Sequence, residues 1–137
     1  MTSVFDSLAQ GFPLLVFYLL AVAAIFVIAL YLYVKLTPHN EFKLVGEGNM
    51  AAAIHLSSLI IALSLPLAAC LIYKVSILDV AMWGTLSVAL QLFLFRMTDM
   101  IFRGIPDLIE RDVAAPVLVL GAFKLAGSII LAFAIAG

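Results

Sequence analysis

Four long apolar runs, separated by short polar stretches, dominate the pattern of this chain. They cover residues 12–34, 50–73, 77–102 and 113–136. Each run exceeds the roughly 20 residues that a helix needs to cross the hydrocarbon core of a bilayer. None alternates apolar and polar positions in the way that a membrane-spanning strand requires. The pattern therefore predicts an all-α integral membrane protein with four transmembrane helices.

Composition supports a fold that is surrounded by lipid. Hydrophobic residues make up 66% of the 137 residues and charged residues 11%, with a mean hydropathy of +1.28. Soluble domains hold about 45–50% apolar and about 25% charged residues, and a small one could not hide this excess from water. We expect one transmembrane domain over residues 1–137, with membrane lipid as its surroundings.

Charge and cysteine content exclude several classes of partner and cofactor. The net charge is −1, and no basic run suggests a nucleic-acid surface. The single cysteine, Cys70, lies inside an apolar run, so neither a disulfide framework nor a zinc-ligand spacing is present. We expect no cofactor, no metal and no nucleic-acid partner.

The basic residues of the short connections predict an orientation. Lys35 and Lys43 lie in the first connection and Arg103 and Arg111 in the third, whereas Lys74 is the only basic residue on the opposite side. Connections rich in Lys and Arg stay in the cytoplasm. The first and third connections are therefore predicted to be cytoplasmic, with both termini outside.

The two halves of the chain resemble each other. Residues 44–53 match residues 107–116 in spacing, so that Glu47 corresponds to Glu110 and Asn49 to Asp112. Asn49 and Asp112 are plausible N-caps for the second and fourth helices. The match predicts two helical hairpins repeated in parallel, although coincidence stays an open alternative.

The same residues resemble a known family. The chain is similar to the YjfL-like family of bacterial inner-membrane proteins (domain of unknown function 350) from Phe12 onward. The resemblance rests on residues 37–41, 47–49, 51–53, 83–84, 91 and 113–115. It implies a multi-pass protein of the bacterial inner membrane with two related hairpins, and it implies no activity. Lys124 and Leu131 depart from the family pattern, so any role of Lys124 is expected to be particular to this protein.

Ionisable groups inside a membrane are costly and are therefore functional candidates. At about 1.5 Å of rise per residue, Lys124 and Gln91 lie roughly 18 Å and 16 Å from the cytoplasmic ends of their helices. Ser57 and Ser58 lie slightly less deep in the second helix. We expect a polar cluster of Lys124, Gln91 and one of these serines near the midplane. Lys124 has four open interpretations: a conduction or binding group, a neutral amine, a subunit contact, or a lysine without function.

Asp99 is expected to have different partners. The same rise places it about 13 Å from Lys124 along the membrane normal, too far for a lysine side chain. Arg96 at i−3 and Arg103 at i+4 share its helix face. We predict an interfacial cluster of ion pairs among Arg96, Asp99 and Arg103.

Two residues of the second helix are candidates for packing or relay. His55 is predicted to make interhelical hydrogen bonds, with proton relay as the alternative. Pro66 removes the backbone hydrogen bond to Ala62, so the freed carbonyl needs Ser58 or a neighbouring helix as its donor.

The sequence offers no set of catalytic residues, so we do not expect an enzyme. His39 and Glu41 provide only two candidate metal ligands, and the connection that holds them is expected to be solvated. Two hypotheses on function remain. The first is a membrane scaffold, or a component of envelope stress or integrity, that binds a cytoplasmic protein partner. The second is a small ion channel or transporter that works as a homo-oligomer.

Overall fold

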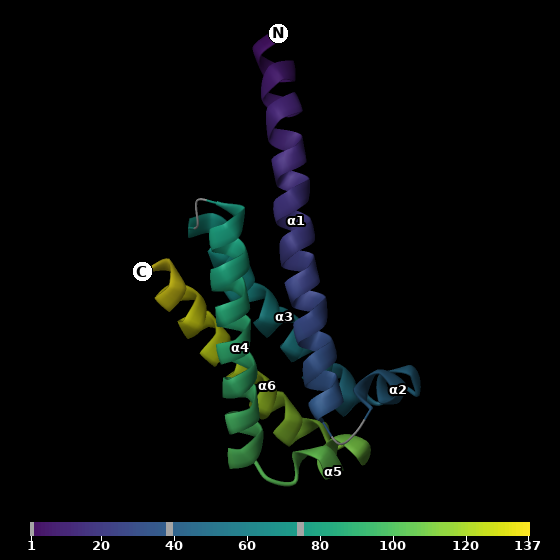
Figure 1. Cartoon of the computed structure of the whole chain (residues 1–137). Helices are drawn as coiled ribbons and strands as arrows, with labels where there is room; N and C mark the ends of the chain where they lie inside the picture. The colour runs from purple at the N-terminus through teal and green to yellow at the C-terminus, as the bar shows by residue number, and fades with distance from the viewer. Residues whose placement is uncertain (1, 38–39, 74–75) are drawn as a thin grey trace.

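The computed structural model describes residues 2–37, 40–73 and 76–137, which form six helices. The four long helices are α1 (Thr2–Leu36), α3 (Met50–Tyr73), α4 (Ile77–Ile101) and α6 (Ala114–Ala136). The two short ones are α2 (Glu41–Gly46) and α5 (Ile105–Glu110), and they lie together at the lower end of the molecule in Figure 1. Within the described ranges, the four long helices are long and apolar enough to cross a membrane. The predicted all-α, four-span fold is confirmed.

Helix α3 is the central element. It makes its widest contact with α6 and also packs against α1 and α4. One core cluster joins Tyr33 of α1, Leu59 and Leu63 of α3, and Phe95 of α4. Because lipid tails are as apolar as these side chains, helices in a membrane associate by close packing and polar contacts more than by leaving the solvent.

The contact between α3 and α6 depends on small residues. Gly121 of α6 faces Ser58 of α3, and a Cβ atom added to Gly121 would lie 3.0 Å from Ser58 Cβ and would collide with its hydroxyl. The Ser58 hydroxyl donates to Ile54 O at 2.8 Å, within its own helix. Glycine at position 121 therefore allows the two backbones to approach closely.

The predicted cap of α3 is confirmed. Asn49 Oδ1 accepts a hydrogen bond from the backbone N–H of Ala52 at 2.8 Å, which satisfies one of the free amides at the helix start. Its amide Nδ2 donates to Ile109 O of α5 at 2.7 Å. Asn49 thus caps α3 and ties it to the second half of the chain.

The predicted cap of α6 is wrong. Helix α6 begins at Ala114 with Val113 at the N-cap, where no side chain caps it. Asp112 Oδ1 instead accepts from the backbone N–H of Ala51, at 2.9 Å, in the first turn of α3. Asp112 has a positive φ of 58°, which turns the chain after α5 and brings this carboxylate to the other helix.

Helix α1 begins ten residues before the predicted boundary at position 12. The prediction followed apolar content, which marks where lipid begins, whereas a helix can continue through mixed residues such as Asp6 and Gln10. Pro13 consequently lies inside the helix. Figure 1 shows that the N-terminal part of α1 extends beyond the other helices.

The first connection is more ordered than expected. Residues 41–46 form α2, and Asn40 caps it by accepting from the Lys43 backbone N–H at 3.2 Å. Glu41, in the first turn, is fully buried. The predicted solvated connection is therefore wrong for Glu41, because α2 packs against α3. His39 lies outside the described residues, as does Lys74.

Candidate functional site

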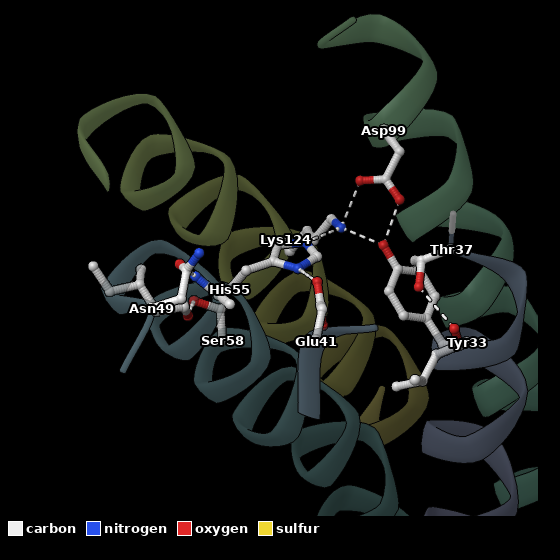
Figure 2. Close-up of polar contacts among 11 residues, drawn as sticks. Tyr33, Thr37, Glu41, Asn49, His55, Ser58, Asp99 and Lys124 are labelled. Carbon is white, nitrogen blue, oxygen red and sulfur yellow. Dashed lines mark hydrogen bonds and ion pairs between the residues drawn. The ribbon is translucent and has the colours of Figure 1, made fainter. Parts of the chain in front are cut away.

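A lysine, a carboxylate and a phenol meet where three long helices converge. Lys124 Nζ of α6 lies 2.6 Å from Asp99 Oδ1 of α4 and donates to Tyr33 Oη of α1 at 2.6 Å. Tyr33 Oη in turn donates to Asp99 Oδ2. Figure 2 shows the resulting triangle of contacts. Both carboxylate oxygens of Asp99 are engaged, each by a different helix.

A histidine and a second carboxylate extend this arrangement. His55 Nε2 lies 2.9 Å from Lys124 Nζ, and His55 Nδ1 contacts Glu41 Oε1. An ammonium group can only donate, so Nε2 acts as the acceptor and Nδ1 carries the hydrogen that Glu41 receives. With a charged Lys124, these contacts correspond to a neutral imidazole. Figure 2 shows the His55 ring between the Glu41 and Lys124 side chains.

We call these five residues the Lys124 network: Tyr33, Glu41, His55, Asp99 and Lys124. They come from α1, α2, α3, α4 and α6, so the network ties five helices together. Four of them are at most 2% exposed, whereas the Asp99 side chain is 19% exposed. Buried charges of this kind are stable only when they are paired and hydrogen-bonded. The network meets that condition for Lys124 and Asp99.

Two aromatic rings enclose the ammonium group. Lys124 Nζ lies 4.9 Å from the ring centroid of Tyr33 and 5.4 Å from that of Phe95. The two rings meet edge to face, with centroids 5.5 Å apart and planes at 79°. Aromatic faces attract a cation. Phe95 is 1% exposed and lies one turn before Asp99 on α4, so it covers the network on the side away from α2 and α5.

A cavity opens onto the network at the end that holds α2 and α5. Its volume is about 550 Å³, and Tyr33, His55 and Asp99 line it together with Lys35 and Arg96. The ends of α1 and α4 and the short helix α5 form its walls. We call it the inner cavity. A second cavity, between α1 and α4, has an almost wholly apolar lining and shares no residue with it.

Comparison with known proteins places the chain in a family. The model described as Domain of Unknown Function (DUF350) matches residues 7–135. The chain belongs to the DUF350 family. It is 32% identical over 106 residues to the UPF0719 inner membrane protein YjfL of Escherichia coli strain K12, which covers 77% of this chain and 80% of that protein. The YjfL protein of Escherichia coli O157:H7 matches to the same extent. No solved structure gives a significant match.

These findings confirm the predicted family and the inner-membrane location, whereas the orientation of the termini stays a prediction. This DUF350 protein is a polytopic inner-membrane protein, and the name of its relatives states that location without an activity. Nothing in the comparisons points to catalysis. The predicted repeat of two hairpins stays a prediction.

The structure places the predicted midplane residues of this DUF350 protein differently from the expectation. Lys124 is central, but its hydrogen-bond partners are Tyr33 and His55. Gln91 is buried on α4, and its Oε1 has no hydrogen-bond partner within the described part of the chain. Ser57 is exposed, and Ser58 packs against Gly121.

The expected separation of Lys124 from Asp99 is wrong, since the two form an ion pair. The expectation assumed that both helices stand upright in the membrane, whereas Figure 1 shows α6 crossing α4 at a marked tilt. A helical side chain also points toward the N-terminus of its helix, which carries the Lys124 ammonium toward α5. Within the described ranges, Arg96 and Arg103 form no ion pair with Asp99, and both are exposed.

His55 and Pro66 both lie at contacts between helices. His55 contacts Lys124 of α6. Ser128 of α6 donates its hydroxyl to Ala62 O, the carbonyl that Pro66 leaves without a helical partner. A neighbouring helix therefore supplies the missing donor.

Two members of the network, Tyr33 and Glu41, are not among the site residues that the sequence predicts. The sequence places Glu41 in a solvated connection. One signal in the sequence could have pointed to a buried acidic residue. His55 and Lys124 lie inside apolar runs, and buried groups of this kind need a nearby anion. Within the described residues, no group of three His, Cys, Asp or Glu side chains lies close enough to hold a metal ion.

Proposed function

We propose that this inner-membrane protein takes up and releases protons at the Lys124 network and responds by moving its helices. The observation that carries the proposal is the graded burial of the network. The Asp99 side chain is 19% exposed and lines the inner cavity, whereas Glu41 at the other end of the network is fully buried. A proton from the aqueous side therefore meets Asp99 first.

Proton uptake at Asp99 would change the contacts between helices. A neutral carboxyl group no longer forms an ion pair with Lys124, whose ammonium would then rely on Tyr33 and His55. Because Asp99 and Lys124 belong to α4 and α6, loss of this ion pair would loosen one helix against the other. The imidazole of His55 offers a further site, since it can exchange protons on both nitrogens.

The cost of burying charge favours this proposal over a purely structural scaffold. Replacing buried ion pairs with apolar side chains is often neutral or stabilising in other proteins, so packing alone does not require them. Ionisable residues inside membranes are rare, and they mark ion pathways, proton relays and ligand sites. A scaffold whose contacts depend on protonation remains compatible with the network.

A channel formed by several copies is the second candidate. Gln91 supports it, because its buried Oε1 lies one turn beyond Phe95 on the same face of α4 as Asp99. A polar path along α4 would run from Asp99 past Phe95 to Gln91. In this candidate Phe95 acts as the closed barrier, and a homo-oligomer would supply the remaining walls.

We also propose that α2 and α5 face the cytoplasm, with both termini outside, because four of the basic residues in the connections lie at that end. Single cysteines at Ser3 and Glu110, in a Cys70→Ala background, test this orientation. A membrane-impermeant maleimide should label position 3 in intact spheroplasts and position 110 only after lysis. The opposite pattern would reverse the orientation.

Infrared difference spectroscopy of the protein in nanodiscs tests the proton site directly. Spectra recorded across a pH titration should contain a protonated-carboxyl band that disappears in Asp99→Asn. The matched control is Asp107→Asn, an exposed carboxylate paired with Arg111 at 2.9 Å, which should leave that band in place. If Asp99→Asn and the native protein give the same spectra at every pH, Asp99 is not the proton site.

A further inference from the structure

The inner cavity contains more positive charge than its acidic groups can neutralise. Arg96 and Lys35 both line it, and both residues are exposed. Within the described part of the chain, neither forms an ion pair with an acidic group. The Lys35 ammonium lies over the Tyr31 ring, 5.4 Å from its centroid. Among the described residues, these two cations therefore have no acidic partner at ion-pair distance.

The acidic residues nearby are already engaged. Asp99 is three residues from Arg96, yet its two carboxylate oxygens contact Lys124 and Tyr33. Glu41 contacts His55. With a neutral His55, Glu41 and Asp99 contribute two negative charges, whereas Lys124, Lys35 and Arg96 contribute three positive charges. The network and the cavity together therefore carry a net positive charge. An anion entering the cavity would restore neutrality.

The shape and the remaining lining define the ligand further. A volume of about 550 Å³ lies within the range of small-molecule sites. The lining also contains apolar side chains from α4 and α5, among them Met100, Ile105 and Ile109. A guanidinium group binds phosphate and carboxylate with two parallel hydrogen bonds. The walls therefore suit a ligand with an anionic head and a short apolar part.

We propose that the inner cavity is a binding site for a phosphate or carboxylate group attached to an apolar moiety, with Arg96 as the principal ligand residue and Lys35 as the second. The anion belongs either to a lipid headgroup or to a soluble amphiphile. Anion binding uses Arg96 and Lys35, whereas the proposed proton uptake uses Asp99. Each idea can therefore fail without the other.

Native mass spectrometry of the detergent-purified protein tests the lipid source. After incubation with equimolar phosphatidylglycerol and phosphatidylcholine, the native protein should retain phosphatidylglycerol preferentially. Arg96→Gln should lower this retention about tenfold, the effect of losing one charged hydrogen-bond pair. Lys35→Gln should lower it less. The matched controls are Arg103→Gln and Lys43→Gln, which remove exposed cations that do not line the cavity.

A competition arm distinguishes the two sources. Octyl phosphate and inorganic phosphate are added to the phosphatidylglycerol complex. Displacement by octyl phosphate at far lower concentration than by inorganic phosphate indicates a site that also accepts soluble amphiphiles. Retention of the lipid against both indicates a lipid site. Either outcome supports the anion site.

Two results would overturn the inference. One is equal retention of phosphatidylglycerol and phosphatidylcholine by the native protein, with no binding of octyl phosphate. The other is a loss of anion binding in Arg103→Gln as large as that in Arg96→Gln, which would indicate general surface attraction. Arg96→Lys, which keeps the charge but not the paired hydrogen bonds, should bind between the native protein and Arg96→Gln.

Discussion

Ser128 of α6 donates its hydroxyl hydrogen to the carbonyl oxygen of Ala62 in α3. Pro66, four residues after Ala62, has no N–H to offer that carbonyl. A side chain of the closest neighbouring helix thus replaces a hydrogen bond that is missing within α3. In a membrane this matters because no water is present to take the place of the missing donor.

Ser128→Ala should therefore lower the free energy of unfolding by about 1 kcal/mol, in the range of interhelical hydrogen bonds in membranes. The loss should be smaller in a Pro66→Ala background, because residue 66 then supplies its own N–H to Ala62. Unfolding by SDS in mixed micelles measures the four free energies of this double-mutant cycle. Ser64→Ala, at an exposed position, is the control. Equal losses in both backgrounds would contradict the coupling.

Gly121→Ala should destabilise the protein by about 1–3 kcal/mol, because the added methyl group overpacks the contact with Ser58. Gly127→Ala is a matched control on the same helix, where a Cβ atom meets nothing within 4 Å. Ser58→Gly should recover part of the loss in the double variant. The same unfolding assay measures each variant, and a neutral Gly121→Ala would show that α3 and α6 can separate freely.

The two partners of the central ion pair should be energetically coupled. Lys124→Met leaves the Asp99 carboxylate without its ammonium partner, and Asp99→Asn leaves the buried ammonium without its anion. We expect each single variant to lose about 3 kcal/mol, and Lys124→Met/Asp99→Asn to lose less than the sum. Thermal unfolding in detergent, with Lys43→Met as the exposed control, checks this order. Strict additivity would mean that the two residues do not interact.

The sequence predicted the spans better than the site, for a physical reason. Apolar content alone marks lipid-facing helices, and the bounds of α3 agree with the prediction. Contacts between side chains also depend on the tilt of each helix, which the apolar residues of that helix alone do not determine. Rise per residue placed Lys124 and Asp99 far apart, whereas the tilt of α6 brings them to 2.6 Å. Burial of Glu41 likewise depends on where α2 packs, which its own six residues do not determine.

Phe95→Ala should increase proton leakage if the path along α4 is closed by this ring. The Phe95 ring contacts the Lys124 ammonium, and Gln91 lies one turn before Phe95 on α4. Removal of the ring should therefore expose the ammonium toward Gln91. Pyranine-loaded liposomes report the rate at which an imposed pH gradient decays. Phe93→Ala, which removes an exposed ring of the same helix, is the control. Indistinguishable rates for the two variants and the native protein would remove Phe95 from any conduction path.

The reciprocal contacts at the start of α3 have a consequence for biosynthesis. The backbone N–H of Ala51 donates to the Asp112 carboxylate, and the Asn49 side-chain amide donates to the backbone carbonyl of Ile109. While the ribosome is still making the second half, the first hairpin lies in the membrane with an incomplete helix end. We therefore expect the start of α3 to reach its final form only once residues 109–112 have been synthesised. Two fragments divided between α3 and α4 should gain protease resistance only when both are synthesised together.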